Sequence, residues 1–501
     1  MTADRSAESP PATAPPYVDV RETHTGVVVL AGDRAYKAKK PVLTDFLDFR
    51  TPEQRERACL REVELNRRLS PASYLGVAHL TDPSGAAAEP IVVMRRYRDD
   101  QRLASMVAGD HPGESIPGVL DTIAAVLARF HARAERTPLI DDRGNAAAIV
   151  QLWRDNISEL HRYAGMANSA VSEEAIARIQ RLAAEFVAGR EALLMRRIEQ
   201  GCIVDGHGDL LADDIFWVDG EPALLDCLEF DDKLRYVDRI DDAAFLAMDL
   251  EFLGRKDLGD YFLERYVAHS ADTVPSSLRD FYIAYRAVVR AKVDCLRESQ
   301  GKSEAAVDAA RHLDIAFRHL ENGAVRLALI GGSPGTGKST VARALAEKVG
   351  AQLISTDDVR RELRASGAIG GDPGVLDAGL YSPDNVTTVY EAALRQAGLC
   401  LANGQSVILD GTWRDSQVRA QAYCVAKQAH SRVVQLMCSA NVDAAVERVR
   451  TRQRGNSDAT PEIATALAAR LNDWDTAVRL DTSRPLQDSL QEAHDIWRQH
   501  T

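Results

Sequence analysis

The sequence predicts a protein of two domains, an α+β domain followed by an α/β domain with a parallel sheet. Three observations lead to this fold class. Residues 17–100 contain short strand-like runs around one helix, and helical periodicity dominates residues 119–322. Residues 324–501 alternate strands with helices, which is typical of a parallel sheet with helices on both faces. A glycine-rich motif, Gly332–Ser339, joins the first strand of this second half to its first helix.

That motif has the form GxxxxGK[ST] in its proper setting, between an apolar strand at 325–330 and a helix at 340–349. Glycines let backbone N–H groups turn inward around phosphate oxygens, and the helix N-terminus adds partial positive charge. Lys338 is expected to reach the β- and γ-phosphates of ATP, and the Ser339 hydroxyl to bind Mg²⁺. The predicted nucleotide-binding residues of the loop are Gly332, Ser333, Pro334, Gly335, Thr336, Gly337, Lys338, Ser339 and Thr340.

Whole-chain properties exclude several classes of function. The 501 residues carry a net charge of −13, which disfavours the basic surface that non-specific nucleic-acid binding needs. The seven cysteines are scattered without a CxxC pair, so a zinc site and a disulfide framework are not expected. We find no signal peptide and no apolar run long enough for a bilayer, which makes the cytoplasm the simplest compartment and a membrane partner unexpected. Residues 1–16, rich in Pro, Ala and Ser, are predicted to be a disordered tail.

The first domain is predicted to begin as a small sheet with one helix. Strands are expected at 24–30, 35–42 and 91–94, and the helix at 52–69. Alternation places Lys37 and Lys39 on the same face of their strand. Helices are then expected at 119–136, 147–163, 172–200, 236–252, 257–269, 275–298 and 303–322.

The helix at 236–252 contains many acids, for which a solvated face is favoured over a metal cluster. Gly323 is the best domain boundary, so the domains are predicted at 17–322 and 324–501.

Several acids converge in the middle of the first domain. His207, Gly208 and Asp209 precede Asp214 and a strand at 215–218, and a second strand ends in Asp226. Kinase chemistry needs such a set: one carboxylate accepts the proton of the attacking hydroxyl, and others hold Mg²⁺ against the phosphates. An HxD pattern followed by a metal ligand five residues later fits His207, Asp209 and Asp214.

With these motifs, residues 17–322 resemble the aminoglycoside phosphotransferase-like, or choline-kinase-like, small-molecule kinases. The resemblance rests on His207–Leu210 and Leu224–Asp226, with support from Leu127–Ala132 and Tyr285–Val293. It implies a bilobal, protein-kinase-like fold. It also implies that Asp209 is the catalytic base, that Asp226 is the main Mg²⁺ ligand, and that Lys37 binds the α- and β-phosphates.

By the same resemblance, Glu62 pairs with the phosphate-binding lysine, and Lys39 is the alternative candidate for that lysine. The sequence departs from the family in having Asp214 at the second metal position, where Asn is usual, and Leu211 where many members have His.

In the second domain, strands are expected at 325–330, 351–356, 406–410, 432–438 and 477–481, and helices at 340–349, 384–402, 417–430, 442–454 and 461–474. Asp357, Arg360 and Asp410 follow the carboxyl ends of two of these strands, the edge at which such sheets bind ligands.

This half resembles the P-loop kinases of the polynucleotide-kinase, zeta-toxin and gluconate-kinase group, with an AAA-type ATP-binding domain. Asp357 and Arg360 match the group's Asp and Arg at +3, which implies that Asp357 activates the substrate hydroxyl and that Arg360 grips the acceptor. Asp410 would be the acid near Mg²⁺. Arg448 and Arg452 share a helix face and look like lid arginines, although a solvated basic helix explains them equally well.

Three functions compete on this evidence. The first is a tandem ATP-dependent kinase that phosphorylates hydroxyl groups of small molecules. The second is a ligand-sensing regulatory ATPase whose first domain is weakly active or inactive. The third is a kinase acting on nucleic-acid ends, which the acidic balance disfavours. The joint presence of Asp209, Asp226 and Asp357 favours the first, because only a transferase needs all three carboxylates placed for a hydroxyl acceptor.

Overall fold

The structure is a computed structural model, and it describes residues 17–22, 26–43, 48–81, 88–109, 115–164, 171–372, 377–451, 465–466 and 474–499. The predicted tail at 1–16 and most of the predicted helix at 461–474 lie outside these residues, as does Arg452. The chain forms two compact units. Unit 1 comprises Met1–Arg143 with Ile203–Asp272, and unit 2 comprises Gly144–Cys202 with Thr273–Thr501. This division does not coincide with the boundary predicted at Gly323.

Unit 1 contains an antiparallel five-stranded sheet with one helix packed on it. The strand order is β1-β2-β3-β5-β4. Helix α1 (Pro52–Asn66) begins at Thr51, whose hydroxyl accepts from the Gln54 N–H in a capping box. The predicted strands and helix are present, but two strands with short apolar runs, β1 and β4, were not predicted. The strands are β1 (Val18–Glu22), β2 (Gly26–Ala31), β3 (Arg34–Lys39), β4 (Tyr74–Leu80) and β5 (Glu89–Arg95).

The rest of unit 1 is helical, with two small antiparallel sheets that position the acidic residues. One sheet pairs β6 (Ile203–Asp205) with β9 (Tyr236–Asp238), and the other is a hairpin of β7 (Ile215–Val218) and β8 (Glu221–Leu224). Residues 236–238 are therefore a strand, where the sequence suggested the start of a helix. The helices are α2 (Leu103–Ala108), α3 (Ile116–Arg133), α4 (Pro138–Asp141), α8 (Arg239–Phe252) and α9 (Lys256–Ser270).

Unit 2 begins with a helical part whose predicted single helix at 172–200 is broken. The break falls between α6 (Glu173–Ala188) and α7 (Glu191–Glu199). A Cβ on Gly189 would lie 2.3 Å from the Ala429 carbonyl oxygen, so this close approach requires glycine. Within the described residues, no helix is both long and apolar enough to cross a membrane. The other helices of this part are α5 (Ala146–Ala164), α10 (Ser276–Ser299) and α11 (Ala305–Asn322).

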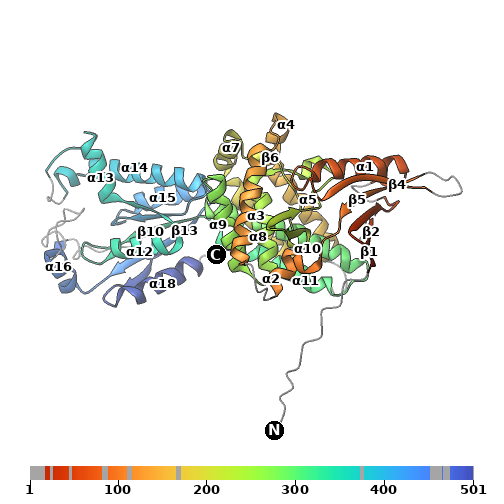
Figure 1. Cartoon of the computed structure of the whole chain (residues 1–501). Coiled ribbons are helices and arrows are strands. Elements are labelled where there is room, and N and C mark those ends of the chain that lie inside the picture. The colour runs from red at the N-terminus through yellow and green to blue at the C-terminus, as the bar shows by residue number, and fades with distance from the viewer. Residues whose placement is uncertain are drawn as a thin grey trace, which may run out of the picture. The chain divides into compact units, whose positions relative to one another are not determined.

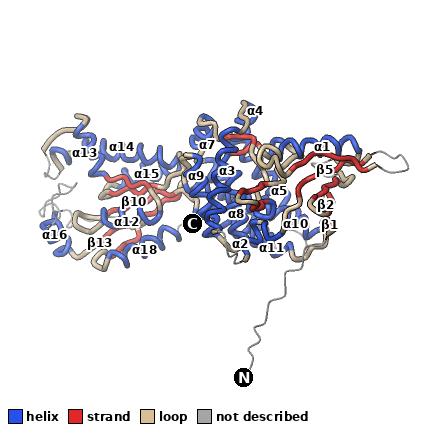
Figure 2. Tube along the Cα trace, viewed as in Figure 1, coloured by secondary structure: helices blue, strands red, loops and turns tan. Residues whose placement is uncertain are grey.

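The rest of unit 2 is a five-stranded parallel sheet of order β11-β12-β10-β13-β14 between two layers of helices (Figure 2). Helices α14 and α15 cover one face, and α12 and α18 cover the other (Figure 1). The strands are β10 (Arg326–Gly331), β11 (Gln352–Ser355), β12 (Val407–Asp410), β13 (Arg432–Ser439) and β14 (Val478–Asp481). The helices are α12 (Lys338–Val349), α13 (Thr356–Ala365), α14 (Pro383–Ala402), α15 (Ser416–Gln428), α16 (Val442–Thr451) and α18 (Leu486–Gln499).

The predicted fold class is confirmed: an α+β part with an antiparallel sheet is followed by a parallel-sheet P-loop part. The pairing register of the strands explains why the candidate site residues of the second half lie at one edge of the sheet. Asp410 pairs with Ile330 on one side and with Ser355 on the other, so three strands end at the same level. The phosphate loop, Asp357 and Asp410 leave the sheet from these three ends.

Candidate active sites

In unit 1, three elements bring a lysine between two carboxylates. Lys37 of β3 places its Nζ 2.9 Å from Glu62 Oε1 of α1 and 2.6 Å from Asp226 Oδ1, just after β8. Burial alone would lower the pKa of Lys37, but the charges of Asp226 and Glu62 raise it well above its usual value. The lysine is thus held as a cation beside the predicted metal ligand. The structure brings together these three residues, which the family resemblance assigned to one site.

Lys39, the alternative lysine, occupies a different place. Its Nζ lies 2.5 Å from Glu62 Oε2 and also pairs with Glu229, and its side chain is 2% exposed. Glu62 therefore bridges both lysines of β3, which alternation had placed on one face. Because Lys37 reaches Asp226, the geometry favours Lys37 for contact with nucleotide phosphates, and Lys39 braces the segment that follows Asp226.

The segment of the predicted base is held by a residue that sequence reasoning misjudged. The Asp242 carboxylate of α8 accepts the backbone N–H groups of His207 at 2.7 Å and Gly208 at 2.8 Å. It also lies 2.9 Å from His131 Nε2. Asp238, Asp241 and Asp242 are buried, so the predicted solvated face is wrong for these three acids. They are buried because a hydrogen-bonded carboxylate can fix a turn from inside, which a charge count does not reveal.

His207 is a spacer rather than a proton carrier in this arrangement. Its Nε2 lies 3.0 Å from the Leu225 carbonyl oxygen, and its Nδ1 accepts the Asp209 N–H at 3.3 Å. Burial lowers the pKa of His207, so the imidazole stays neutral, with its proton on Nε2. It ties the Asp209 segment to the strand that leads into Asp226.

Asp214 and Asp226 are adjacent through the backbone, because the Leu225 N–H donates to the Asp214 carbonyl at 2.9 Å. Burial, and then the charges of Asp226 and Asp209, raise the pKa of Asp214 well above its ordinary value. Asp226 has a φ of 61°, a left-handed conformation that costs about 1 kcal/mol or more for a non-glycine residue. Such a strained, crowded set of carboxylates fits a divalent cation, which would offset the repulsion.

Among the described residues, no group of three His, Cys, Asp or Glu side chains could hold a metal ion unaided. Mg²⁺ fits such a site nonetheless, because it is commonly bound by one or two carboxylates together with substrate phosphates and water. The candidate ligands are Asp214 and Asp226 in unit 1, and Ser339 with Asp410 in unit 2.

In unit 2, the phosphate loop has the backbone that its glycines predict. Gly335 and Gly337 have φ values of 83° and 80°, and Gly337 is the N-cap of α12. A Cβ on Gly335 would lie 2.2 Å from the Ala445 carbonyl oxygen of α16. The Thr336 hydroxyl donates to the Ser333 carbonyl at 2.8 Å, which closes the loop on itself. Lys338 and Ser339 then form the first turn of α12, where the helix N-terminus favours anions.

Asp410 lies beside this first turn. It is 4% exposed, and its Oδ1 has no hydrogen-bond partner in the part of the chain that the structure describes. Burial raises the pKa of Asp410. The Lys338 charge and a hydrogen bond with Ser339 act in the opposite direction, but the pKa remains above its ordinary value. A buried, incompletely satisfied carboxylate next to a hydroxyl is a suitable oxygen set for Mg²⁺ and its waters.

Asp357 and Arg360 form the ion pair that their spacing suggests, with Arg360 Nη1 2.7 Å from Asp357 Oδ1. The Arg360 guanidinium also lies 4.4 Å from the centre of the Tyr381 ring. Nearby, the Tyr390 hydroxyl accepts the Thr412 N–H at 3.1 Å and so shapes the turn after Asp410. Sequence reasoning missed both tyrosines, since neither belongs to a motif and each is brought in by the packing of α13 and α14.

Arg448 lies next to the phosphate loop, whereas its predicted companion Arg452 is outside the described residues. Arg448 Nη2 donates to the Thr482 carbonyl at 3.0 Å. The Thr482 hydroxyl in turn donates to the Thr336 carbonyl at 2.6 Å. Arg450, on the same helix, is exposed and pairs with Glu447, as expected for a residue on a solvated helix face. Thr482 is a loop-positioning residue that the sequence did not reveal, because it follows the last strand without any motif.

Known proteins match the second half of the chain and also almost the whole chain. Residues 327–472 match the AAA domain family, in agreement with the AAA-type domain predicted for this half. A protein of Mycobacterium tuberculosis (strain ATCC 25618 / H37Rv), named only as uncharacterized, is 64% identical over 497 residues and covers 99% of both chains. An adenylate kinase of Stenotrophomonas maltophilia (strain R551-3) is 37% identical over 146 residues, which are 28% of this chain and 74% of that enzyme.

Among solved structures, a choline/ethanolamine kinase family protein from Mesorhizobium loti matches with a TM-score of 0.38 and 13% identity. The match covers 62% of this chain and 92% of that one. The matched AAA domain and the geometry of the phosphate loop together support ATP-dependent phosphotransfer as the general activity.

Proposed function

Because the chain belongs to the family of the mycobacterial protein that it matches over almost its whole length, we propose that its two halves act as tandem kinases in one polypeptide. Each half transfers the γ-phosphoryl group of ATP to a hydroxyl group of a small molecule. The relative covers both halves, so neither half is a local addition to this chain. Small-molecule acceptors are proposed because the chain is strongly acidic, with a net charge of −13.

One observation carries the proposal: each half has, besides its phosphate-binding lysine, a separate carboxylate suited to a hydroxyl acceptor. In unit 1 that carboxylate is Asp209, on a segment fixed by Asp242. In unit 2 it is Asp357, oriented by Arg360 at 2.7 Å. A nucleotide-driven switch needs the lysine, the Mg²⁺ hydroxyl and one acid, and it has no use for these additional carboxylates.

In unit 1, Lys37 binds phosphate oxygens while Glu62 keeps its ammonium group in place. Asp214 and Asp226 would hold Mg²⁺, which would supply charge neutralisation at the phosphates. Asp209 accepts the proton of the acceptor hydroxyl as the oxygen attacks the γ-phosphorus, and the bond to the β-γ bridging oxygen breaks. The neutral His207 accepts the Asp209 N–H and so positions Asp209, without taking part in proton transfer.

In unit 2, the backbone N–H groups of the phosphate loop and Lys338 orient the phosphates at the start of α12. Ser339 and Asp410 would supply oxygens to hold Mg²⁺ and its waters. Asp357 accepts the proton of the second acceptor, and Arg360, whose guanidinium lies over the Tyr381 ring, holds that acceptor. Arg448 stands beside the loop, where a cation stabilises charge on the transferring phosphoryl group.

The test is transfer of labelled γ-phosphate from Mg²⁺–ATP into a small-molecule extract by the full-length protein. We expect Asp209→Asn and Asp357→Asn each to abolish a different labelled product, because each removes the acceptor-activating base of one half. The matched controls are Asp213→Asn, an acid with a side chain 70% exposed, and Asp358→Asn, which pairs with Arg361. Both controls are expected to leave the two products unchanged.

Release of free phosphate alone by wild type, unaffected by either substitution, would contradict the proposal and favour the regulatory ATPase. Loss of a single product by Asp357→Asn only, with no product that depends on Asp209, would limit the kinase activity to unit 2.

A further inference from the structure

A polar cavity lies in unit 2, away from the phosphate loop. It has a volume of about 330 Å³ and is lined by Glu321, Asn322, Arg326, Asp495, Arg498 and Gln499. Arg326 is the first residue of β10, and the phosphate loop follows its last residue, Gly331. At about 3.3 Å per residue, the cavity is about 16 Å from the loop, at the opposite edge of the sheet. A nucleotide phosphate bound at the loop therefore does not reach it.

The floor of the cavity is a buried arginine. Arg326 is 4% exposed, and its Nη1 and Nη2 donate to the carbonyls of Ala324 at 2.8 Å and Glu321 at 3.0 Å. Its Nε has no hydrogen-bond partner in the described part of the chain. Burial, and then the nearby Arg432 charge, lower the pKa of Arg326 to about 10. Capping the end of α11 accounts for two of its donors, but the guanidinium remains an incompletely satisfied buried cation.

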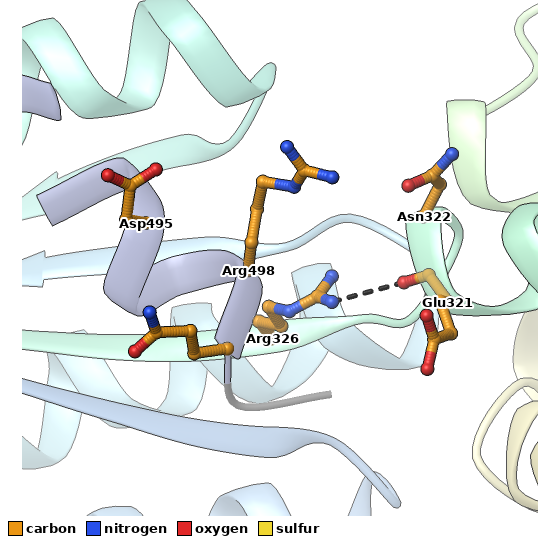
Figure 3. A pocket seen from close by; sticks show the side chains of 6 residues that line it. Glu321, Asn322, Arg326, Asp495 and Arg498 are labelled. Carbon is orange, nitrogen blue, oxygen red and sulfur yellow. Dashed lines mark hydrogen bonds between the residues drawn. The ribbon is translucent and has the colours of Figure 1, made fainter. Parts of the chain in front are cut away.

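A second arginine reaches the same place from α18. Figure 3 shows the guanidinium groups of Arg326 and Arg498 both pointing toward the end of α11 that carries Glu321 and Asn322. The side-chain amides of Asn322 and Gln499 add further donors to the lining. Two forked cations and two amides from three elements thus surround one small volume.

The acids of the cavity are already engaged. Glu321 Oε1 lies 2.5 Å from Arg178 Nη2, which offsets its charge. Asp495 is exposed on the rim, where it accepts the Gln491 side-chain amide at 2.9 Å. With Arg178 counted, the three arginines Arg178, Arg326 and Arg498 outnumber the two acids at the cavity, in a protein whose net charge is −13.

We propose that this cavity is a second anion site, which binds the phosphate group of a small phosphorylated molecule. Donors that come from β10, α11 and α18 surround the group from several directions, which suits the tetrahedral oxygens of a phosphate better than the two coplanar oxygens of a carboxylate. Asp495 and Glu321 at the edge suit hydroxyl or amino groups on the rest of the ligand. A bound phosphate would also join α11, at the end of the helical part, to the first strand and the last helix of the P-loop part.

The site is tested by isothermal titration of inorganic phosphate into the full-length protein, saturated with Mg²⁺ and a non-hydrolysable ATP analogue so that the nucleotide sites are filled. We expect wild type to bind phosphate and Arg498→Gln to bind it at least about tenfold more weakly, as loss of a charged hydrogen bond implies. The matched control is Arg318→Gln on α11, where the arginine pairs with Asp314 outside the cavity.

Arg326→Lys provides a second variant, because it keeps the charge but loses the fork. We expect it also to weaken phosphate binding by about tenfold, with the unfolding temperature measured to show that the chain still folds. Phosphate affinity in Arg498→Gln equal to that of wild type would overturn the proposal. So would citrate binding to this cavity more tightly than phosphate, since that would identify a polycarboxylate site.

Discussion

The two lysines that we propose to bind phosphate, Lys37 and Lys338, are held in opposite ways. In unit 1, Lys37 projects from a strand and is fixed between Glu62 and Asp226, with its side chain 15% exposed. In unit 2, Lys338 starts helix α12, directly after the glycine-rich loop whose backbone we propose to hold the phosphates. The surroundings of Lys37 are assembled from side chains of three separate elements. The phosphate-holding part of the second site lies in one continuous stretch of chain, Gly332–Ser339.

This difference determines what each site loses when its lysine is removed. The N–H groups of the phosphate loop and the start of α12 remain in place without Lys338. The sequence of unit 1 offers no glycine-rich loop that could replace Lys37. Asp226 would also lose the cation that, against the effect of burial, holds its pKa below the ordinary value. Glu62 is less affected, because Lys39 still lies 2.5 Å from it.

The largest expected effect comes from Lys37→Met and Lys338→Met, compared side by side. Each should reduce formation of the product of its own half by about 10²- to 10³-fold, because each removes a fixed charge from the transferring phosphates. The two should differ in nucleotide affinity. Lys338→Met keeps most of its ADP binding, since backbone donors remain, whereas Lys37→Met loses most of it. Product formation and ADP affinity, measured separately for each half, check this.

Lys40→Met is the control for unit 1, because Lys40 is adjacent in sequence but pairs with the exposed Glu22. Equal loss of ADP affinity in both lysine variants would show that the loop backbone contributes little, and the contrast between the sites would be wrong.

The same contrast explains how much the sequence could predict. The phosphate loop is contiguous, so its glycines, Lys338 and Ser339 were readable from eight residues, and parallel alternation placed Asp410 and Asp357 at the same edge. Lys37 and Asp226 of the unit 1 site are 189 residues apart in the chain, and only a family resemblance brought Lys37, Glu62 and Asp226 together. Asp242 and Thr482 belong to no motif. Their roles arise from burial and from hydrogen bonds to backbone, which periodicity does not encode.

An intermediate effect is expected for Asp242→Asn. Asn can accept only through one oxygen, so one of the two backbone N–H groups that the carboxylate binds loses its acceptor. The Asp209 segment then shifts, and the Asp209-dependent product should fall by between about 10- and 100-fold. Breaking this buried pair with His131 should also reduce the free energy of unfolding by about 3 kcal/mol. Denaturant titration and product formation measure the two effects.

The pH dependence of the unfolding free energy tests the role of Asp242 independently. Burial alone would raise its pKa, but the hydrogen bond with His131, the charge of His131 and the hydrogen bond from the His207 backbone N–H hold the pKa well below the ordinary value. A carboxyl group whose pKa is lowered in the folded state contributes its full stabilisation of that state at pH values above its unfolded pKa of about 3.9. This contribution is lost as the pH falls below that value. Wild type should therefore lose unfolding free energy below about pH 4 more steeply than Asp242→Asn. Parallel pH curves would contradict the role given to this carboxylate.

The smallest effect, and the sharpest test of a backbone-built site, is expected for Thr482→Val. This substitution keeps the shape of a side chain that is 7% exposed, but it removes the hydroxyl that donates to the Thr336 carbonyl. If the loop needs external support, loss of one hydrogen bond of about 1 kcal/mol should raise the KM for ATP by about fivefold in the Asp357-dependent reaction alone. Thr451→Val is the control, because in the described part of the chain its hydroxyl donates within α16, to the Glu447 carbonyl at 2.8 Å. An unchanged KM in Thr482→Val would mean that the glycine backbone holds its own conformation, and that Arg448 and Thr482 are neighbours of the loop rather than part of what positions it.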